Sequence, residues 1–78
     1  MSPTFLNYTG FRFFIWSKEE ERMHVHIEKD SNYCKCWLEP KISIENNKGF
    51  KDFELKKIIK IVKANEKEFI EKWKSHFS

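Results

Sequence analysis

The chain has 78 residues, with 15 Lys and Arg against 12 Asp and Glu, which gives a formal net charge of +3. Its length predicts one domain, residues 1–78, and its 40% hydrophobic content excludes a disordered chain. No apolar stretch is long enough to cross a membrane and the N-terminus lacks a signal-peptide pattern, so we expect a cytoplasmic protein that contacts no membrane.

An antiparallel sheet is predicted over residues 11–45, after an N-terminal segment at residues 1–10. The first strand is rich in aromatic residues, and the later strands alternate apolar and polar residues with a period of two. Short turn-forming stretches separate them, which favours a meander in which consecutive strands pair. The four expected strands are residues 11–17, 23–29, 33–39 and 41–45.

A helical region is predicted over residues 50–77, because apolar residues there recur at i, i+3, i+4 and i+7. The stripe keeps nearly the same phase along the region, which favours one long helix. Asn65 followed by Glu68 has the spacing of a capping box, which would begin a second helix. The fold class is therefore α+β: a four-stranded antiparallel sheet with one long or two short C-terminal helices packed on one face.

The two faces of the sheet are expected to differ in role. The core face packs on the helices and carries Met23, Val25, Ile27, Cys34, Cys36, Leu38, Ile42 and Ile44. The other face has no helix above it and carries His24 and His26, which we expect to be half-exposed. A slip of one residue in the first strand would bring Phe13 and Ile15 to this open face. Otherwise its expected binding residues are Phe14, Trp16, Glu28, Tyr33, Trp37 and Glu39.

Three uses of this open face follow from its residue types. Its aromatic residues favour an interface with a partner protein or with a second copy of the chain. They also stack on the bases of single-stranded RNA, with Lys35 and Arg12 on phosphates. As an active site, His24 and His26 would be the acid and base of metal-independent RNA cleavage, and Lys35 would stabilise the phosphate charge.

No metal site and no cofactor are expected. His24 and His26 are two residues apart on a strand and could reach one ion. A tetrahedral site needs further ligands, which Glu28 or His76 would have to supply, and the sequence has no zinc motif. Both cysteines are predicted to be buried and reduced, so they are poor nucleophiles.

Lysines in the helical region form a second candidate surface. Residues 48–78 contain nine Lys and five Asp or Glu, a net charge of +4. Several of these lysines fall on one side of the helix, where they form either a solvated surface or contacts for a phosphate backbone. The i, i+4 pair of Asp52 and Lys56 favours the first interpretation. With Arg12, the candidate phosphate contacts are Lys56, Lys60, Lys63 and Lys67.

Several stretches occur in the order found in a known family: GFRFFIWS, HVHIEKD, CKCWLEP, NNKGF and ELKKIIKIVKANEKEFIEKWKSHF. From Pro3 to the C-terminus, the chain resembles the bacterial domain-of-unknown-function family 4160. Met23 stands where members of the family often have proline. The residues that match the motifs of the family are Phe14, His24, His26, Lys35, Trp37 and Glu39.

The resemblance implies a small stand-alone bacterial protein without an assigned activity. Members often lie beside a second small gene, in the style of toxin–antitoxin modules. We therefore expect an interaction module of toxin–antitoxin type whose open face binds a partner protein, with RNA as a further ligand. The partner would be the product of the neighbouring gene or a second copy of the chain. The alternative is a metal-independent ribonuclease-type toxin that uses His24, His26 and Lys35.

Overall fold

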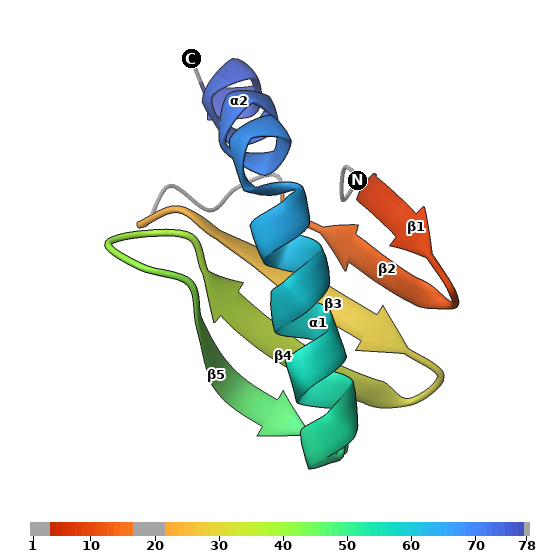
Figure 1. Cartoon of the computed structure of the whole chain (residues 1–78). Coiled ribbons are helices and arrows are strands. Elements are labelled where there is room, and N and C mark those ends of the chain that lie inside the picture. The colour runs from red at the N-terminus through yellow and green to blue at the C-terminus, as the bar shows by residue number, and fades with distance from the viewer. Residues whose placement is uncertain (1–3, 17–21, 78) are drawn as a thin grey trace.

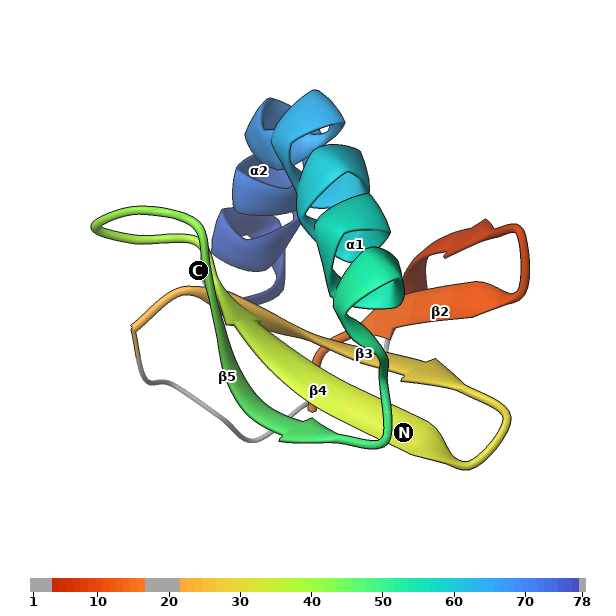
Figure 2. The same ribbon diagram turned by 60° about the horizontal axis from the view of Figure 1, so that its bottom comes forward.

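An antiparallel sheet and two helices make up the computed structural model, which describes residues 4–16 and 22–77 (Figure 1). Both helices lie on the same side of the sheet (Figure 2). None of the helices in these ranges is long and apolar enough to span a bilayer. The elements are β1 (Thr4–Tyr8), β2 (Phe11–Phe14), β3 (His24–Lys29), β4 (Asn32–Trp37), β5 (Ser43–Lys48), α1 (Asp52–Ala64) and α2 (Glu66–Phe77).

The strands pair in the order β1-β2-β3-β4-β5, and every neighbouring pair is antiparallel, which confirms the predicted meander. The prediction of four strands is wrong, because the described residues form five. The additional strand is β1, for which residues 1–10 give only a weak signal. Its hairpin turn consists of Thr9 and Gly10, with φ of 47° and 87°. Such a turn requires positive φ at both residues, and threonine is not a typical residue there.

The register of β2 settles which aromatic residues share a face with the histidines. Phe14 pairs with His26 across β2 and β3, and Phe13 pairs with Ile27. Phe13 and Ile15 are therefore buried on the core face. The strand ends at Phe14, earlier than the predicted end at residue 17.

A bulge interrupts β5, which covers residues 43–48 rather than the predicted 41–45. Lys35 pairs with Glu45, and Tyr33 pairs with Lys48. One residue therefore separates the two pairs on β4, whereas two residues separate them on β5. Asn46 occupies the bulge with φ of 55°, a left-handed conformation that asparagine tolerates. The additional residue turns Lys48 to the face that carries Tyr33 and Lys35.

Two helices, not one, follow the sheet in the described part of the chain. The backbone N–H of Lys51 donates to Glu54 Oε1 at 3.0 Å, which supports the first turn of α1. At its other end, Asn65 Nδ2 donates to the carbonyl oxygen of Ile61 at 2.8 Å. The Asn65 backbone N–H donates to the same carbonyl oxygen at 3.1 Å, so Asn65 bonds the last turn of α1 through both its side chain and its backbone, and the chain turns there into α2.

The core lies between the sheet and the helices. The predicted core residues Val25, Ile27, Cys34, Cys36 and Leu38 are buried, and Met23, Ile42 and Ile44 pack partly buried against them. Aromatic rings join the two layers, since Phe69 of α2 lies 5.7 Å from the ring centroids of both Phe5 and Phe13. Lys72 Nζ also donates to the Phe5 carbonyl oxygen at 2.9 Å, which ties α2 to β1.

Candidate functional site

The sheet face opposite the core residues carries most of the residues singled out from sequence. Cross-strand pairing sets His26 between Phe14 and Lys35, and sets His24 opposite Trp37. Trp16 lies two residues beyond Phe14 and its ring reaches His26. We call this surface the histidine face, and define it as Phe14, Trp16, His24, His26, Tyr33, Lys35, Trp37 and Lys48.

His26 is enclosed by aromatic side chains. The Trp16 ring stacks on the imidazole with 3.9 Å between ring centroids, and Phe14 lies 5.4 Å away. His26 Nδ1 lies 2.6 Å from the Tyr33 hydroxyl, a short hydrogen bond between β3 and β4. The residue is only 1% exposed, so the expectation of a half-exposed histidine is wrong here.

His24 is also buried, with 0% of its surface exposed. Its Nδ1 donates to the Arg22 carbonyl oxygen at 2.7 Å. Because a carbonyl oxygen can only accept, this bond places a hydrogen on Nδ1. The ring contacts Trp37 of β4 at 5.6 Å and Trp73 of α2 at 5.0 Å, both edge to face. Sequence patterning predicts that only strand residues surround His24, but Trp73 of α2 also contacts it.

A hollow of about 330 Å³ opens beside Trp16, lined by Trp16, His26, Tyr33, Lys35, Asn46 and Lys48. Trp16 is 44% exposed, so the ring offers a free side while it stacks on His26. The planes of Trp16 and Tyr33 differ by only 5°, with 6.4 Å between centroids. The hollow therefore combines flat aromatic surfaces with two lysines that the bulge in β5 brings together.

Cations lie against rings across the histidine face. Lys35 Nζ is 4.2 Å from the centre of the Trp37 ring and 3.9 Å from Glu45 Oε2, and its side chain is 11% exposed. The Arg22 guanidinium lies over the same ring at 3.7 Å. The two ring contacts favour a positive charge at the face, because the aromatic ring attracts a cation.

Two predicted binding residues have structural contacts. Glu28 Oε1 accepts a hydrogen bond from Arg12 at 2.8 Å, and the Arg12 guanidinium lies 4.4 Å from the Phe14 ring centre. Glu39 Oε2 accepts from the Met23 backbone N–H at 2.9 Å, next to the bond from Leu38 N–H to the Met23 carbonyl. These contacts hold β2 on β3 and the start of β3 on the end of β4.

The structure separates the helical lysines from the histidine face. Lys56, Lys60 and Lys63 are exposed on α1, and Lys67 is exposed on α2. Both helices lie on the core side of the sheet (Figure 2), and none of these four lysines lines the hollow beside Trp16 and His26. Of the candidate phosphate contacts, Arg12 alone pairs with a residue beside the histidines.

Neither metal binding nor thiol chemistry finds support in the described residues. Within residues 4–16 and 22–77, no group of three His, Cys, Asp or Glu side chains gathers as a metal site. Burial raises the pKa of Cys34 to about 12, as does the nearby Cys36, and burial raises the pKa of Cys36 to about 12. Both thiols therefore stay protonated near neutral pH and are poor nucleophiles.

Four residues of the site are missed by sequence patterning: Arg22, Asn46, Lys48 and Trp73. Lys48 and Asn46 belong to a stretch that patterning assigns to a loop, and the bulge alone directs Lys48 to the histidine face. The signal that could have revealed it is Asn46 itself, since asparagine tolerates positive φ. Arg22 and Trp73 come from outside the alternating strands, so no strand period marks them.

A family model with the description Domain of unknown function (DUF4160) matches residues 10–74 of the chain. No curated protein and no solved structure gives a significant match. The match spans β2 to β5, α1 and most of α2, and therefore includes every residue of the histidine face.

Proposed function

The chain belongs to the DUF4160 family, and from the geometry of its hollow we propose that it is a small binding module for single-stranded RNA. One observation carries this proposal: the half-exposed Trp16 ring lies beside two lysines, Lys35 and Lys48, in one hollow. A nucleotide is a flat ring joined to an anionic phosphate, so the two kinds of group match its two parts.

The ring surfaces favour a nucleic acid whose bases are unpaired. In a duplex the faces of the bases are stacked, whereas in single-stranded RNA they are free to stack on tryptophan or tyrosine. One side of Trp16 is taken by His26, which leaves the other side for a base. The Tyr33 ring, whose plane is parallel to that of Trp16, lines the same hollow and offers a second flat surface.

The lysines supply the phosphate contact. Lys48 is exposed, and Lys35 is held by Glu45 and by the Trp37 ring at the rim of the same hollow. Ammonium groups that neutralise phosphates release counterions, so binding of this kind weakens as salt is added. The Asn46 side chain lines the hollow as well and offers both a donor and an acceptor to a base edge.

The buried histidines favour binding over catalysis. A general acid or base must come within hydrogen-bond distance of the group whose proton it transfers. His24 and His26 are 0% and 1% exposed, and Trp16 covers His26. We therefore assign the histidines a positioning role, in which they hold the rings of Trp16, Tyr33 and Trp37 in place.

The family resemblance implies a biological context for this binding, that of a toxin–antitoxin module. We infer that the chain is an interaction module of toxin–antitoxin type, in which RNA and a protein partner are both ligands. Binding of RNA by the histidine face leaves the helix side of the sheet for a protein (Figure 2).

Binding of fluorescein-labelled single-stranded RNA, measured by anisotropy, tests the proposal. Loss of one base–tryptophan stack costs about 1–3 kcal/mol, so Trp16→Ala should weaken binding about 5- to 150-fold. Lys48→Ala should reduce the slope of log affinity against log salt by about 0.7, the value for one phosphate of a single strand. Lys67→Ala is the matched control, because Lys67 is an exposed lysine on α2.

Several outcomes would contradict the RNA proposal. Equal affinity for duplex RNA would exclude base stacking, and equal loss in the Lys67→Ala variant would indicate charge attraction alone. Cleavage of the RNA that disappears in His26→Ala, with binding retained, would favour the ribonuclease alternative. Equal binding of single-stranded DNA would contradict RNA as the specific ligand and would assign the hollow to single strands of either kind.

A further inference from the structure

A groove of about 400 Å³ lies on the other side of the sheet, between β1 and α1. Leu6 and Tyr8 of β1 line one wall, and α1 forms the other wall. Residues from both walls define what we call the β1 groove: Leu6, Tyr8, Lys57, Lys60, Ile61 and Ala64. Its middle is apolar and lysines stand at its rim, so it differs in chemistry from the hollow beside Trp16.

The strand beside the groove is an edge of the sheet. β1 is first in the strand order, so in the described part of the chain no strand pairs with its outer side. Alternate N–H and C=O groups of an edge strand point away from the sheet and can pair with an added strand. The Phe5 carbonyl is taken by Lys72, which restricts an added strand to the part of β1 from Leu6 to Tyr8.

The register shows which side chains of β1 face the groove. Leu6 pairs with the buried Phe13, and Tyr8 pairs with the buried Phe11, so both lie on the core side of the sheet. Tyr8 is 50% exposed, because no neighbouring strand covers it within residues 4–16 and 22–77. An apolar side chain of an added strand would cover the exposed part of this ring.

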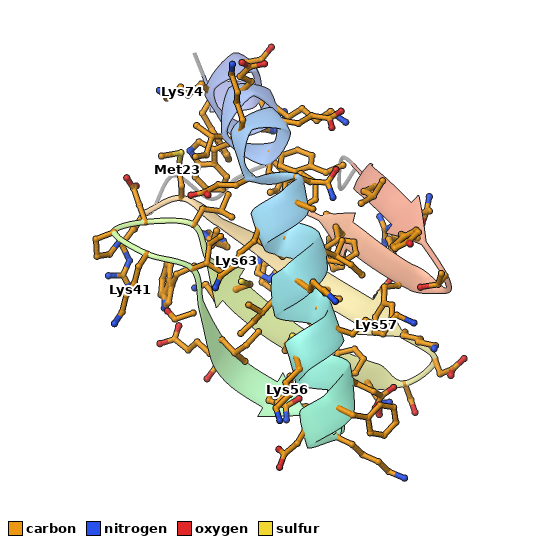
Figure 3. The ribbon with its side chains drawn as sticks, in the orientation of Figure 1. Met23, Lys41, Lys56, Lys57, Lys63 and Lys74 are labelled. Carbon is orange, nitrogen blue, oxygen red and sulfur yellow. The ribbon has the colours of Figure 1, made fainter. Side chains whose placement is uncertain are left out.

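The charge of the groove selects its ligand. None of the described residues that line it is acidic, and α1 carries four Lys against one Asp and one Glu, a net charge of +2. Lys57 points from α1 toward β1 and β2, whereas Lys56 and Lys63 lie on the other side of the helix (Figure 3). Lys57 and Lys60 therefore present positive charge along one wall.

We propose that the β1 groove binds an extended acidic segment of a partner protein, which adds a strand to β1. The Cβ atoms of residues at i and i+3 on a helix, such as Lys57 and Lys60, are about 5–6 Å apart. Alternate residues of a strand are about 6.6–6.8 Å apart and point to the same side. Two acidic residues at successive alternate positions would match the spacing of the lysines, and an apolar residue at the next alternate position would cover the apolar middle.

This site is independent of the RNA-binding proposal, because the β1 groove and the histidine face lie on opposite sides of the sheet. Its probe is the peptide acetyl-Thr-Glu-Thr-Glu-Thr-Leu-amide, added to the isotope-labelled chain and followed by amide chemical shifts in NMR spectra. We expect shifts at residues 6–8 and along the facing side of α1. A peptide methylated on alternate backbone nitrogens, which cannot pair as a strand, should lose them.

Charge reversal gives matched variants of the protein. Lys57→Glu/Lys60→Glu should abolish the shifts, and a peptide with lysine in place of glutamate should restore them. Lys56→Glu/Lys63→Glu makes the same change of charge on the other flank of α1 and should leave the shifts intact. Thermal unfolding of each variant checks that these exposed substitutions leave the fold unchanged.

Four results would overturn the proposal. They are shifts confined to residues outside the groove, no shifts at millimolar peptide, equal loss in both double variants, and equal binding by the methylated peptide. Concentration-dependent shifts at β1 without peptide, lost in a variant that is monomeric by sedimentation, would instead assign the groove to a second copy of the chain.

Discussion

Substitution of Asn46 by valine tests how the bulge in β5 positions the RNA-binding hollow. Asn46 has φ of 55°, in the left-handed region. That conformation costs an ordinary residue about 1–2 kcal/mol, and a β-branched side chain such as valine fits it poorly. In a domain of this size, 1 kcal/mol shifts Tm by about 4–8 °C, so Asn46→Val should lower Tm by about 4–16 °C.

Asn46→Gly is the matched control, because glycine adopts positive φ without steric cost. Thermal unfolding followed by circular dichroism should give a Tm for this variant close to that of the wild type. RNA affinity, measured where all three proteins are folded, should fall in Asn46→Val, because a rearranged bulge turns Lys48 away from Lys35. Equal Tm and equal affinity for the valine and glycine variants would refute the bulge as the feature that places Lys48.

Further predictions concern the thiols, the α2 contact and one glycine. The pKa of Cys34 and of Cys36 is raised from 9.0 to about 12, so the stability from each protonated thiol is full below pH 9 and is lost as the pH rises toward 12. Urea unfolding should therefore show a steeper loss of stability above pH 9 in the wild type than in the double alanine variant. Trp73→Ala should cost about 3–5 kcal/mol, against less than about 0.5 kcal/mol for the exposed Phe53→Ala, by the same assay. Gly49→Ala should lower Tm strongly, because Gly49 has φ of 102° and an added Cβ would clash with Oδ1 of Asn32 at the start of β4.

The fold could be predicted where apolar residues recur with a single period along a stretch, two for a strand or about 3.6 for a helix. The alternation in residues 23–29 and 33–39 assigns Val25, Ile27 and Cys36 to the core, and each is buried. β1 could not be predicted in this way, because its turn places a threonine at positive φ. At the break between the helices, the Asn65 side chain bonds back to α1. The apolar stripe of the sequence runs through this position without interruption, so the stripe does not reveal the break.

The candidate site was harder to predict than the fold. Strand alternation tells which face a side chain occupies, but it says nothing of what lies above that face. His24 and His26 are on the predicted face, yet Trp16 and Trp73 bury them from other elements. Lys48 lies on that face although alternation does not place it there, because one additional residue in β5 reverses the alternation. Contacts between distant elements therefore decide which groups are reachable.

The hydrogen bond between Lys72 and the Phe5 carbonyl cannot form early in synthesis of the nascent chain. Synthesis proceeds from the N-terminus, so all five strands of the described chain emerge from the ribosome before Lys72 does. Phe5 likewise meets its ring partner Phe69 only when α2 is made. Until then the apolar side of β1 lacks the cover of α2, and exposed apolar surface promotes aggregation. Folding of α2 thus covers the apolar residue Phe5 of β1.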